Sequence, residues 1–457
     1  MNRERKHGAV RLRRVLKCAG PLLLAVTPGA WAQAQQPPGQ AQGQQISWGL
    51  DLGARYTDNV GRTDTNEQSD TVGIAGLNFA VDVSRPRLDA RAAADLRYQE
   101  YFESDFDSRV NGVLDGSLGF ALVPERFVWV VQENYGQVTR NRQVADNPDN
   151  LQDINYFSTG PDITLPLGRR TSVQLSGRWS DAYFEQGNQD SVTATGSLAL
   201  VRQLSSSTSL SLNGSYSEID FDQDQEFVDY TVEQAFLRLA ITGARTTLSL
   251  DGGVSRLERD NSSSKSDTAL ARLDLQRLIG ARSSLRLVAG TTPSNTQQSF
   301  RLDQQIGQQI GGGVDISPDS EVVAGDSFRS DYAYVTFATD WERTSVTLLL
   351  SGRKQDHEVF TVLDREQYRG TLTYSHDLTQ NVSIDVRGTY LDEKFTETGF
   401  GFDQWGAGLG MRWELSQRIS LRARVDHYVG SSDDGTRDYT ENRAYVGISY
   451  SSDSGGY

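Results

Sequence analysis

Hydrophobic and polar residues alternate along most of the chain after residue 45. Residues 382–390, VSIDVRGTY, and residues 419–426, ISLRARVD, each place apolar side chains at every second position and charged or small polar ones between them. A period of two puts successive side chains on opposite faces of a strand. Beyond residue 30 the sequence shows neither a long apolar run nor a helical period. The pattern predicts an all-β protein whose strands have one apolar and one charged face.

The expected strands come in repeating pairs. GARTTLSLDGG at 243–253 returns as GARSSLRLVAG at 280–290, 37 residues later. The first apolar positions of ten such strands lie 37–44 residues apart, except for one interval of 61. Each strand runs into a polar, often acidic loop, and a second strand returns to a short turn such as SRPR or VPER. The spacing predicts ten hairpins with short turns on one side and longer loops on the other.

A membrane barrel explains both faces of these hairpins. Propellers and solenoids also repeat at fixed intervals, but a propeller needs an apolar core between its blades, and a soluble sandwich would have to bury Arg422, Arg424 and Asp426. In a barrel the apolar face meets lipid, the charged face lines a wet lumen, and closure leaves no unpaired edge. We therefore expect a single transmembrane antiparallel up-and-down β-barrel over residues 46–452. Twenty strands are predicted; eighteen is the alternative, if the first hairpin or the proline-containing stretch 153–167 fails to pair.

Residues 1–32 form a distinct N-terminal segment. Seven Lys and Arg residues precede a short apolar run, CAGPLLLAVTPGAWA, which ends in Ala-Trp-Ala. A basic start, an apolar stretch too short to span a bilayer and a small-residue cleavage site are typical of a signal peptide. Residues 33–45, rich in Gln, Pro and Gly, are expected to be a disordered linker. Residues 453–457 are expected to be a C-terminal tail.

Charge and cysteine content narrow the possible functions. After residue 32 the chain has 38 basic and 59 acidic residues, a formal net charge of −21, and no cysteine. Such an acidic chain is not a general binder of nucleic acid, which requires Lys and Arg to neutralise phosphates. Disulfides and thiol chemistry are excluded as well. Only 37% of residues are hydrophobic, but 18 Tyr, 17 Phe and 7 Trp argue against disorder.

The predicted strand count also sets the orientation. An even number of strands after an exported N-terminus places both termini in the periplasm of a Gram-negative bacterium, with short periplasmic turns and longer extracellular loops. The final strand, ENRAYVGISYSS at 441–452, resembles the C-terminal signal that the barrel assembly machinery recognises, although the usual terminal Phe is missing. The expected partners are therefore outer-membrane lipid and the assembly machinery.

The charged face supplies the candidate lumen residues. Both signs of charge occur on it, which favours ion pairs between strands in a wet interior over a selectivity ring of one sign. The lumen-lining candidates are Arg178, Arg286, Arg353, Arg387, Arg422, Arg424, Asp251, Asp274, Asp385 and Asp426.

The irregular interval of 61 holds a long insertion at residues 293–328. Loops of this length are uncommon and often functional. One hypothesis is that it folds into the mouth or lumen and narrows the pore. The alternative is a mobile outer loop, or two strands that continue above the membrane. Its acidic residues, the candidates for a constriction, are Asp303, Asp315, Asp319, Glu321 and Asp326.

Catalysis is not expected. Asp356, His357 and Glu358 lie near an outer strand end, where a barrel hydrolase would keep acid–base residues, but no G-x-S-x-G nucleophile motif accompanies them. Metal-ligand clusters, phosphate-binding loops and dinucleotide fingerprints are also missing from the sequence, so no cofactor or metal is predicted. A barrel hydrolase is the least favoured function.

The repeated strands, such as RTSVQLSGRWS (170–180), QRISLRARV (417–425) and ARTTLSLDG (244–252), resemble the putative outer-membrane β-barrel porins often encoded beside exopolysaccharide synthesis and export genes. The resemblance covers the chain after the leader but rests on patterning, so no functional residue is carried over. It implies a channel for polysaccharide export or for diffusion of hydrophilic solutes, with polysaccharide and periplasmic export components as partners. The alternative is a non-conducting surface barrel that acts as a structural or adhesive scaffold.

Overall fold

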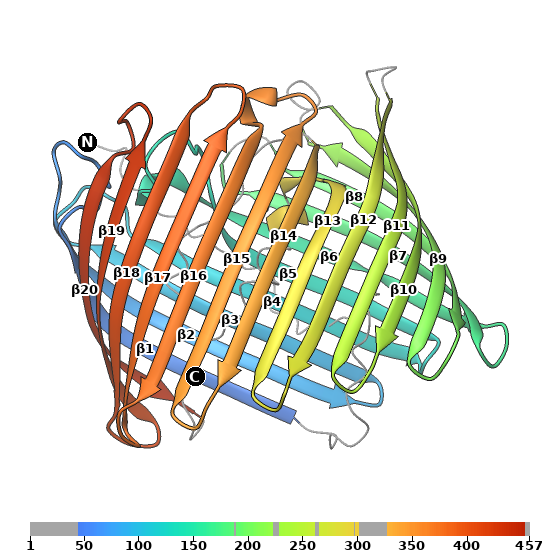
Figure 1. The fold of residues 1–457 in the computed structure, drawn as a ribbon, viewed down its shortest axis with the longest axis horizontal. Coiled ribbons are helices and arrows are strands. Elements are labelled where there is room, and N and C mark those ends of the chain that lie inside the picture. Colours follow the sequence, from blue (N-terminus) through green and yellow to red (C-terminus); the bar gives the residue numbers. More distant parts are fainter. Residues whose placement is uncertain are drawn as a thin grey trace, which may run out of the picture.

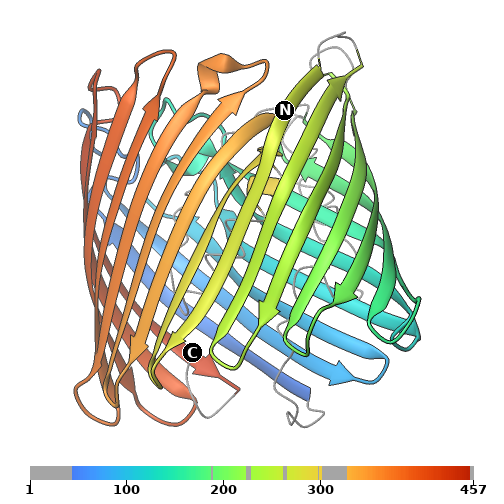
Figure 2. The same ribbon diagram turned by 45° about the vertical axis from the view of Figure 1, so that its right-hand side comes forward.

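A computed structural model describes residues 44–186, 189–222, 228–260, 265–296, 298–300 and 327–452. Within these residues, twenty strands form one antiparallel sheet that closes on itself because β1 pairs with β20. The strands are tilted against the barrel axis (Figures 1 and 2). The predicted all-β, up-and-down barrel with twenty strands is confirmed.

The strands are 12–16 residues long, somewhat longer than the roughly 9–11 residues that a tilted membrane strand requires. Their bounds are β1 (Gln44–Thr57), β2 (Asp70–Arg85), β3 (Leu88–Tyr101), β4 (Arg109–Val123), β5 (Phe127–Thr139), β6 (Leu151–Pro166), β7 (Thr171–Phe184), β8 (Ser191–Gln203), β9 (Thr208–Phe221), β10 (Tyr230–Thr242), β11 (Thr246–Arg259), β12 (Lys265–Ile279), β13 (Ser283–Ser294), β14 (Phe328–Asp340), β15 (Thr344–His357), β16 (Arg365–Asp377), β17 (Val382–Phe395), β18 (Gly401–Glu414), β19 (Ile419–Ser432) and β20 (Tyr439–Ser451). Short 3₁₀ turns, η1 (Pro148–Asn150) and η3 (Thr361–Leu363), lie in two loops.

The two ends of the barrel differ in their connections. At one end, here called the short-turn end, two to four residues join successive strands. At the other, the long-loop end, five to 33 residues do so. β1 begins and β20 ends at the short-turn end, because Gly49 pairs with Ser451 and Gln44 with Val83 beside the β2–β3 turn. β1 begins at Gln44, two residues before the expected start of the barrel. The expected leader at 1–32 and the tail at 453–457 lie outside the described residues.

Alternation divides each strand into an outward and an inward face. Large apolar side chains are exposed on the outward face, for example Leu52 at 61% and Val446 at 61%. Trp179 and Tyr216 lie on the same face toward the long-loop end, as expected of aromatic residues at a membrane interface. Tyr428, near the same end of β19, faces inward instead, and the guanidinium groups of Arg62 and Arg443 lie over its ring. It is on the same face of β19 as Arg422, Arg424 and Asp426.

The proline-containing stretch that left the strand count open pairs on both sides. β6 is hydrogen-bonded along its length to β5, whereas its ladder with β7 is interrupted between Thr159 and Asp162. Pro161 has no N–H to donate, and Gly160 adopts a φ of +158°. A guanidinium nitrogen of Arg178 donates to the Pro161 carbonyl at 3.1 Å, so the interruption is bridged by a side chain.

Gly112 in β4 provides a test of the register between β3 and β4. Its φ is +150°, and a Cβ at this position would overlap the Asp95 carbonyl oxygen. We expect Gly112→Ala to destabilise the folded barrel by about 1–3 kcal/mol, because the strand backbone has to shift. Urea titration of the protein in vesicles would measure the loss. Gly388→Ala is the matched control, since no atom lies within 4 Å of its Cβ; equal losses in both variants would contradict this account.

Candidate functional site: the lumen and its mouth

The ten predicted lumen residues all occupy strand positions opposite to the exposed apolar ones. On β19, for example, Arg422 and Arg424 alternate with Ile419, Ala423 and Val425. Arg424 contacts Asp385 at 3.0 Å and Asp426 at 2.8 Å. Arg286 pairs with Asp274, and Arg178 pairs with Asp162, both at 2.8 Å. Arg353 instead donates to the Tyr334 hydroxyl. Arg387 takes no part in these pairs.

Asp251, on the inner face of β11, is only 3% exposed. Arg238 donates to both of its oxygens at 2.7 Å, and Arg272 donates to one of them at 3.0 Å. Both guanidinium groups lie against the Phe236 ring, at 5.4 and 4.7 Å from its centroid. Bidentate contact of this kind is the stronger form of an ion pair. Arg238 and Arg272 were not among the predicted lumen residues, although the alternation on β10 and β12 places both side chains on the inward face.

The loop between β5 and β6, residues 140–150, reaches across the long-loop end. Its Asp146 carboxylate accepts from Arg437 of the β19–β20 loop at 3.2 Å, and its Asp146 carbonyl accepts from Arg62 of the β1–β2 loop at 3.4 Å. Arg437 also donates to the Arg142 carbonyl at 2.6 Å. Arg62 lies in the loop after β1, and Arg437 lies in the loop before β20. β1 and β20 are the strands that close the barrel, and several strands separate both loops from β5. The loop therefore folds over the lumen.

Buried charges hold the loop in place, and we call them the mouth cluster. Arg365 donates to Glu393 on β17 at 2.8 Å, and Arg437 lies 4.0 Å from the same carboxylate. Arg62 contacts Glu441 at 3.0 Å. None of these residues is more than 4% exposed. A buried charge is tolerated only when it is paired, so the members stabilise one another as a group. The cluster consists of Arg62, Arg142, Arg365, Arg437, Asp146, Glu393 and Glu441.

The loop arginines of the cluster respond differently to burial. Burial opposes the charge of Arg62, yet Tyr439, Glu441 and Asp146 raise the pKa of its guanidinium above the ordinary value. Burial lowers the pKa of the Arg437 guanidinium, and Asp146 and Glu393 counteract that effect only in part. Arginine remains protonated in proteins, so the mouth cluster keeps its positive charges at neutral pH.

Two further loops turn inward at the same end. Asn295, just after β13, donates to the Tyr230 hydroxyl at 3.1 Å, and Phe300 packs with Val138 and Phe184 on the inner faces of β5 and β7. Phe360, between β15 and β16, packs against a buried cluster on β9–β11 that consists of Ile219, Phe221, Tyr230 and Leu257. The beginning of the 293–328 insertion thus contacts the inner wall. Its predicted constriction residues, Asp303, Asp315, Asp319, Glu321 and Asp326, lie outside the described residues, and their role remains a prediction.

The β5–β6 loop was missed by sequence reasoning because its signal is weak. The segment NRQVADNPDN at 141–150 carries one arginine among polar residues and no periodicity. Its asparagine residues nevertheless determine its local structure. The Asn147 side chain accepts a hydrogen bond from the Asn150 backbone N–H at the start of η1, and the Asn150 side chain donates to the Asn141 carbonyl at 2.7 Å. Such Asn side chains favour turns. They predict a compact loop, but they do not predict which part of the barrel it contacts.

The acid–base residues near the end of β15 do not converge. His357 is buried against the Phe328 ring with centroids 4.8 Å apart, and its backbone N–H donates to Asp364. The neighbouring Asp356 lies on the other face of the strand, where Lys354 contacts it at 2.9 Å. Glu358 accepts from Ser266 at 2.8 Å. Adjacent positions on a strand point in opposite directions. Asp356 and Glu358 therefore do not pair with His357 as an acid–base dyad would.

Two features are absent from the described residues. Across that part of the chain, helices that are long and apolar enough to cross a membrane do not occur. Over the same residues, no three His, Cys, Asp or Glu side chains gather as ligands of a metal ion.

Comparison with known proteins supports a porin-like barrel. A family model described as "Putative beta-barrel porin 2" matches residues 367–451, which comprise most of β16 and the whole of β17–β20. No curated protein matches. With this match and the closed sheet, the chain is a β-barrel of the outer-membrane type.

Solved structures with a similar arrangement are distant in sequence. The FrpB iron transporter from Neisseria meningitidis is 8% identical, with a TM-score of 0.44 over 89% of this chain and 81% of that one. The siderophore receptor PirA from Pseudomonas aeruginosa is 10% identical, with a TM-score of 0.42 over 90% and 81%. A loop-deletion mutant of OmpT, an outer membrane protein of Vibrio cholerae, is 11% identical, with a TM-score of 0.32 over 90% and 99%.

Proposed function

We propose that the protein is an outer-membrane channel for hydrophilic solutes, narrowest at the long-loop end. The observation that carries this proposal is the inner wall: ion pairs such as Arg238–Asp251 and Arg286–Asp274 line it, while apolar side chains occupy the outer face. A wall of paired charges serves no purpose in a barrel filled by an apolar core, but it suits a path for polar solutes. The β5–β6 loop sets the width of that path at the mouth cluster.

Carbohydrate is the solute class that the wall fits best. Arginine and aspartate beside aromatic rings, as at Phe236 and Tyr334, can donate to and accept from hydroxyl groups while the ring face covers the apolar side of a sugar. The resemblance to porins encoded with exopolysaccharide genes points the same way. Export of a polysaccharide, with periplasmic export components as partners, is the finer form of this proposal.

The proposed orientation places the short-turn end in the periplasm. Both termini then lie on that side, and the mouth cluster faces the outside of a Gram-negative cell. The assembly machinery and outer-membrane lipid are the partners that this location requires. A solute leaving the cell would enter between the short turns and pass the β5–β6 loop last.

Conductance of a single barrel tests the channel directly. We expect residues 33–457, refolded and inserted into a planar bilayer, to give discrete, stable conductance steps, because the wetted wall conducts ions. Heat-modifiable migration on a gel would first show that the barrel is folded. Complete silence from a folded protein would overturn the open channel and favour the non-conducting surface scaffold.

A further inference from the structure

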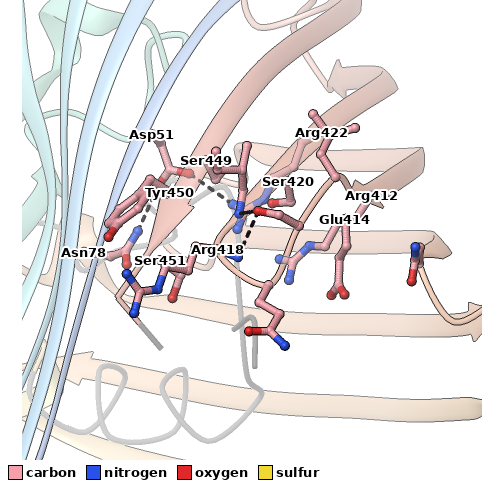
Figure 3. Close-up of a pocket in the computed structure, with 15 residues that line it drawn as sticks. Asp51, Asn78, Arg412, Glu414, Arg418, Ser420, Arg422, Ser449, Tyr450 and Ser451 are labelled. Carbon is pink, nitrogen blue, oxygen red and sulfur yellow. Dashed lines mark hydrogen bonds and ion pairs between the residues drawn. The ribbon is translucent and has the colours of Figure 1, made fainter. Parts of the chain in front are cut away.

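A cavity opens on the inner side of the barrel at the short-turn end, away from the mouth cluster. Its volume is about 290 Å³, and its lining comes from β1, β2, β18, β19 and β20 together with the β18–β19 turn and Asn381 of the β16–β17 turn. Figure 3 shows Asp51, Arg412 and Arg422 around it, with the turn residue Arg418 at its edge. The volume is at the lower end of the range of small-ligand pockets, which begins at about 300 Å³.

Two guanidinium groups meet in this cavity. Arg412 on β18 and Arg422 on β19 are directly opposed partners in the sheet, and both face inward. Like charges at directly opposed positions destabilise a sheet unless an anion lies between them. Two carboxylates also line the cavity: Glu414 lies two residues after Arg412 on β18, and Asp51 on β1 lies 3.5 Å from Arg422. That separation exceeds the 2.8 Å of the Arg286–Asp274 pair elsewhere in the wall, so the contact with Arg422 is loose.

Several buried polar atoms of the cavity lack a hydrogen-bond partner among the described residues. They include Nε of Arg422, Oδ1 of Asp51 and of Asn78, and the hydroxyl oxygens of Ser449 and Ser451. Asp51 and Ser449 are only 8% and 7% exposed. Leaving such groups without partners costs free energy, and a ligand that satisfies them recovers it. Here donors for an anion lie beside acceptors for hydroxyl groups.

We propose that this cavity binds an acidic sugar unit of the transported polymer. The carboxylate of the sugar lies between Arg412 and Arg422, since planar guanidinium groups match carboxylate geometry. Its hydroxyl groups donate to Asp51 and Asn78 and exchange hydrogen bonds with Ser449. The inference rests on the proposed function and deepens it: the solute is an anionic polysaccharide that the barrel captures at its short-turn entrance.

Equilibrium binding separates this inference from the channel proposal, because a folded but silent barrel can still bind. Oligoglucuronate, neutral glucose oligomers of equal length and inorganic phosphate would each be titrated calorimetrically into the refolded protein in detergent. We expect oligoglucuronate to bind at least about tenfold more tightly than either of the others, because it alone offers the site both a carboxylate and sugar hydroxyl groups.

Substitution locates the binding. Arg422→Gln should weaken oligoglucuronate binding by about tenfold or more, and Arg412→Gln should act in the same direction. Arg256→Gln is the control: it removes an exposed arginine from the outward face of β11, away from the cavity and the lumen, and should leave oligoglucuronate binding unchanged. Heat-modifiable migration shows that each variant is folded.

The inference is overturned if neutral and acidic oligomers bind equally, or if Arg422→Gln binds as the unaltered protein does. Phosphate that binds as tightly as oligoglucuronate would overturn the assignment to a sugar. Binding without conductance would refute the open channel but support the sugar site. Conductance without binding would refute the sugar site but support the open channel.

Discussion

Replacing residues 141–149 by a short Gly-Ser connection should raise single-channel conductance several-fold. In the intact protein this segment crosses the long-loop end and is held there by Arg437, which donates to the Arg142 carbonyl at 2.6 Å and to Asp146 at 3.2 Å. The strands it joins, β5 and β6, are paired along their length, so the barrel should close without it. Removing the segment widens the narrowest part of the proposed path. Planar-bilayer recording on folded protein would measure the change.

The control for this experiment lies on the outside of the barrel. Arg256 and Asp267 form a 2.7 Å ion pair on the outward face near the same end, with side chains 49% and 67% exposed. Asp267→Asn should leave conductance unchanged, because the pair does not contact the lumen. If the shortened loop conducts no better than this control, the β5–β6 loop is not the constriction, and the narrowest point has to be sought elsewhere in the lumen.

Glu393→Gln should be the most destabilising point substitution in the mouth cluster. Glu393 is 1% exposed, and its carboxylate lies 2.8 Å from Arg365 and 4.0 Å from Arg437. Neutralising it leaves buried guanidinium groups without their counter-charge, which typically costs about 3–5 kcal/mol. Urea titration of the folded barrel in vesicles would measure the loss. Because Arg437 also anchors Asp146, we expect noisier conductance as the loop detaches.

The matched comparison again uses the exposed pair. Asp267→Asn removes one carboxylate from a contact with Arg256 that is shorter than any made by Glu393, yet solvent screens the charges there. We expect the stability of this variant to be nearly unchanged. A loss in Glu393→Gln no greater than in Asp267→Asn would mean that the buried cluster does not hold the loop, and the explanation of the narrow mouth would fail with it.

The strands could be predicted from the sequence because their signal is local. Alternation in segments such as ISLRARVD depends only on neighbouring residues, and a membrane barrel requires that alternation on every strand. The alternation is sufficient to place Arg422, Arg424 and Asp426 on one face. It is not sufficient at 153–167, since Pro161 breaks the pattern there. Pairing with β5 on the other side maintains this strand in the folded barrel.

The site could be predicted only in part. Alternation indicates that an arginine faces inward, but it does not identify its partner. Arg437 and Arg142 are separated by 295 positions, and Arg422 reaches Asp51 only because β20 closes on β1. Alternation places Tyr428 on the same inward face, but only the structure shows that Arg62 and Arg443 lie over its ring.

By itself, the sequence determined the strands outside residues 153–167, their inward and outward faces and the difference between the two ends, because alternation and turn residues act over a few positions. The tertiary structure alone decided that the β5–β6 loop crosses the mouth, that Glu393 lies among arginines from separate strands, and that Arg412 and Arg422 face a common cavity. These contacts depend on the stagger and closure of the whole sheet. Each is therefore set by every hairpin in the barrel together, and no single segment of the sequence encodes it.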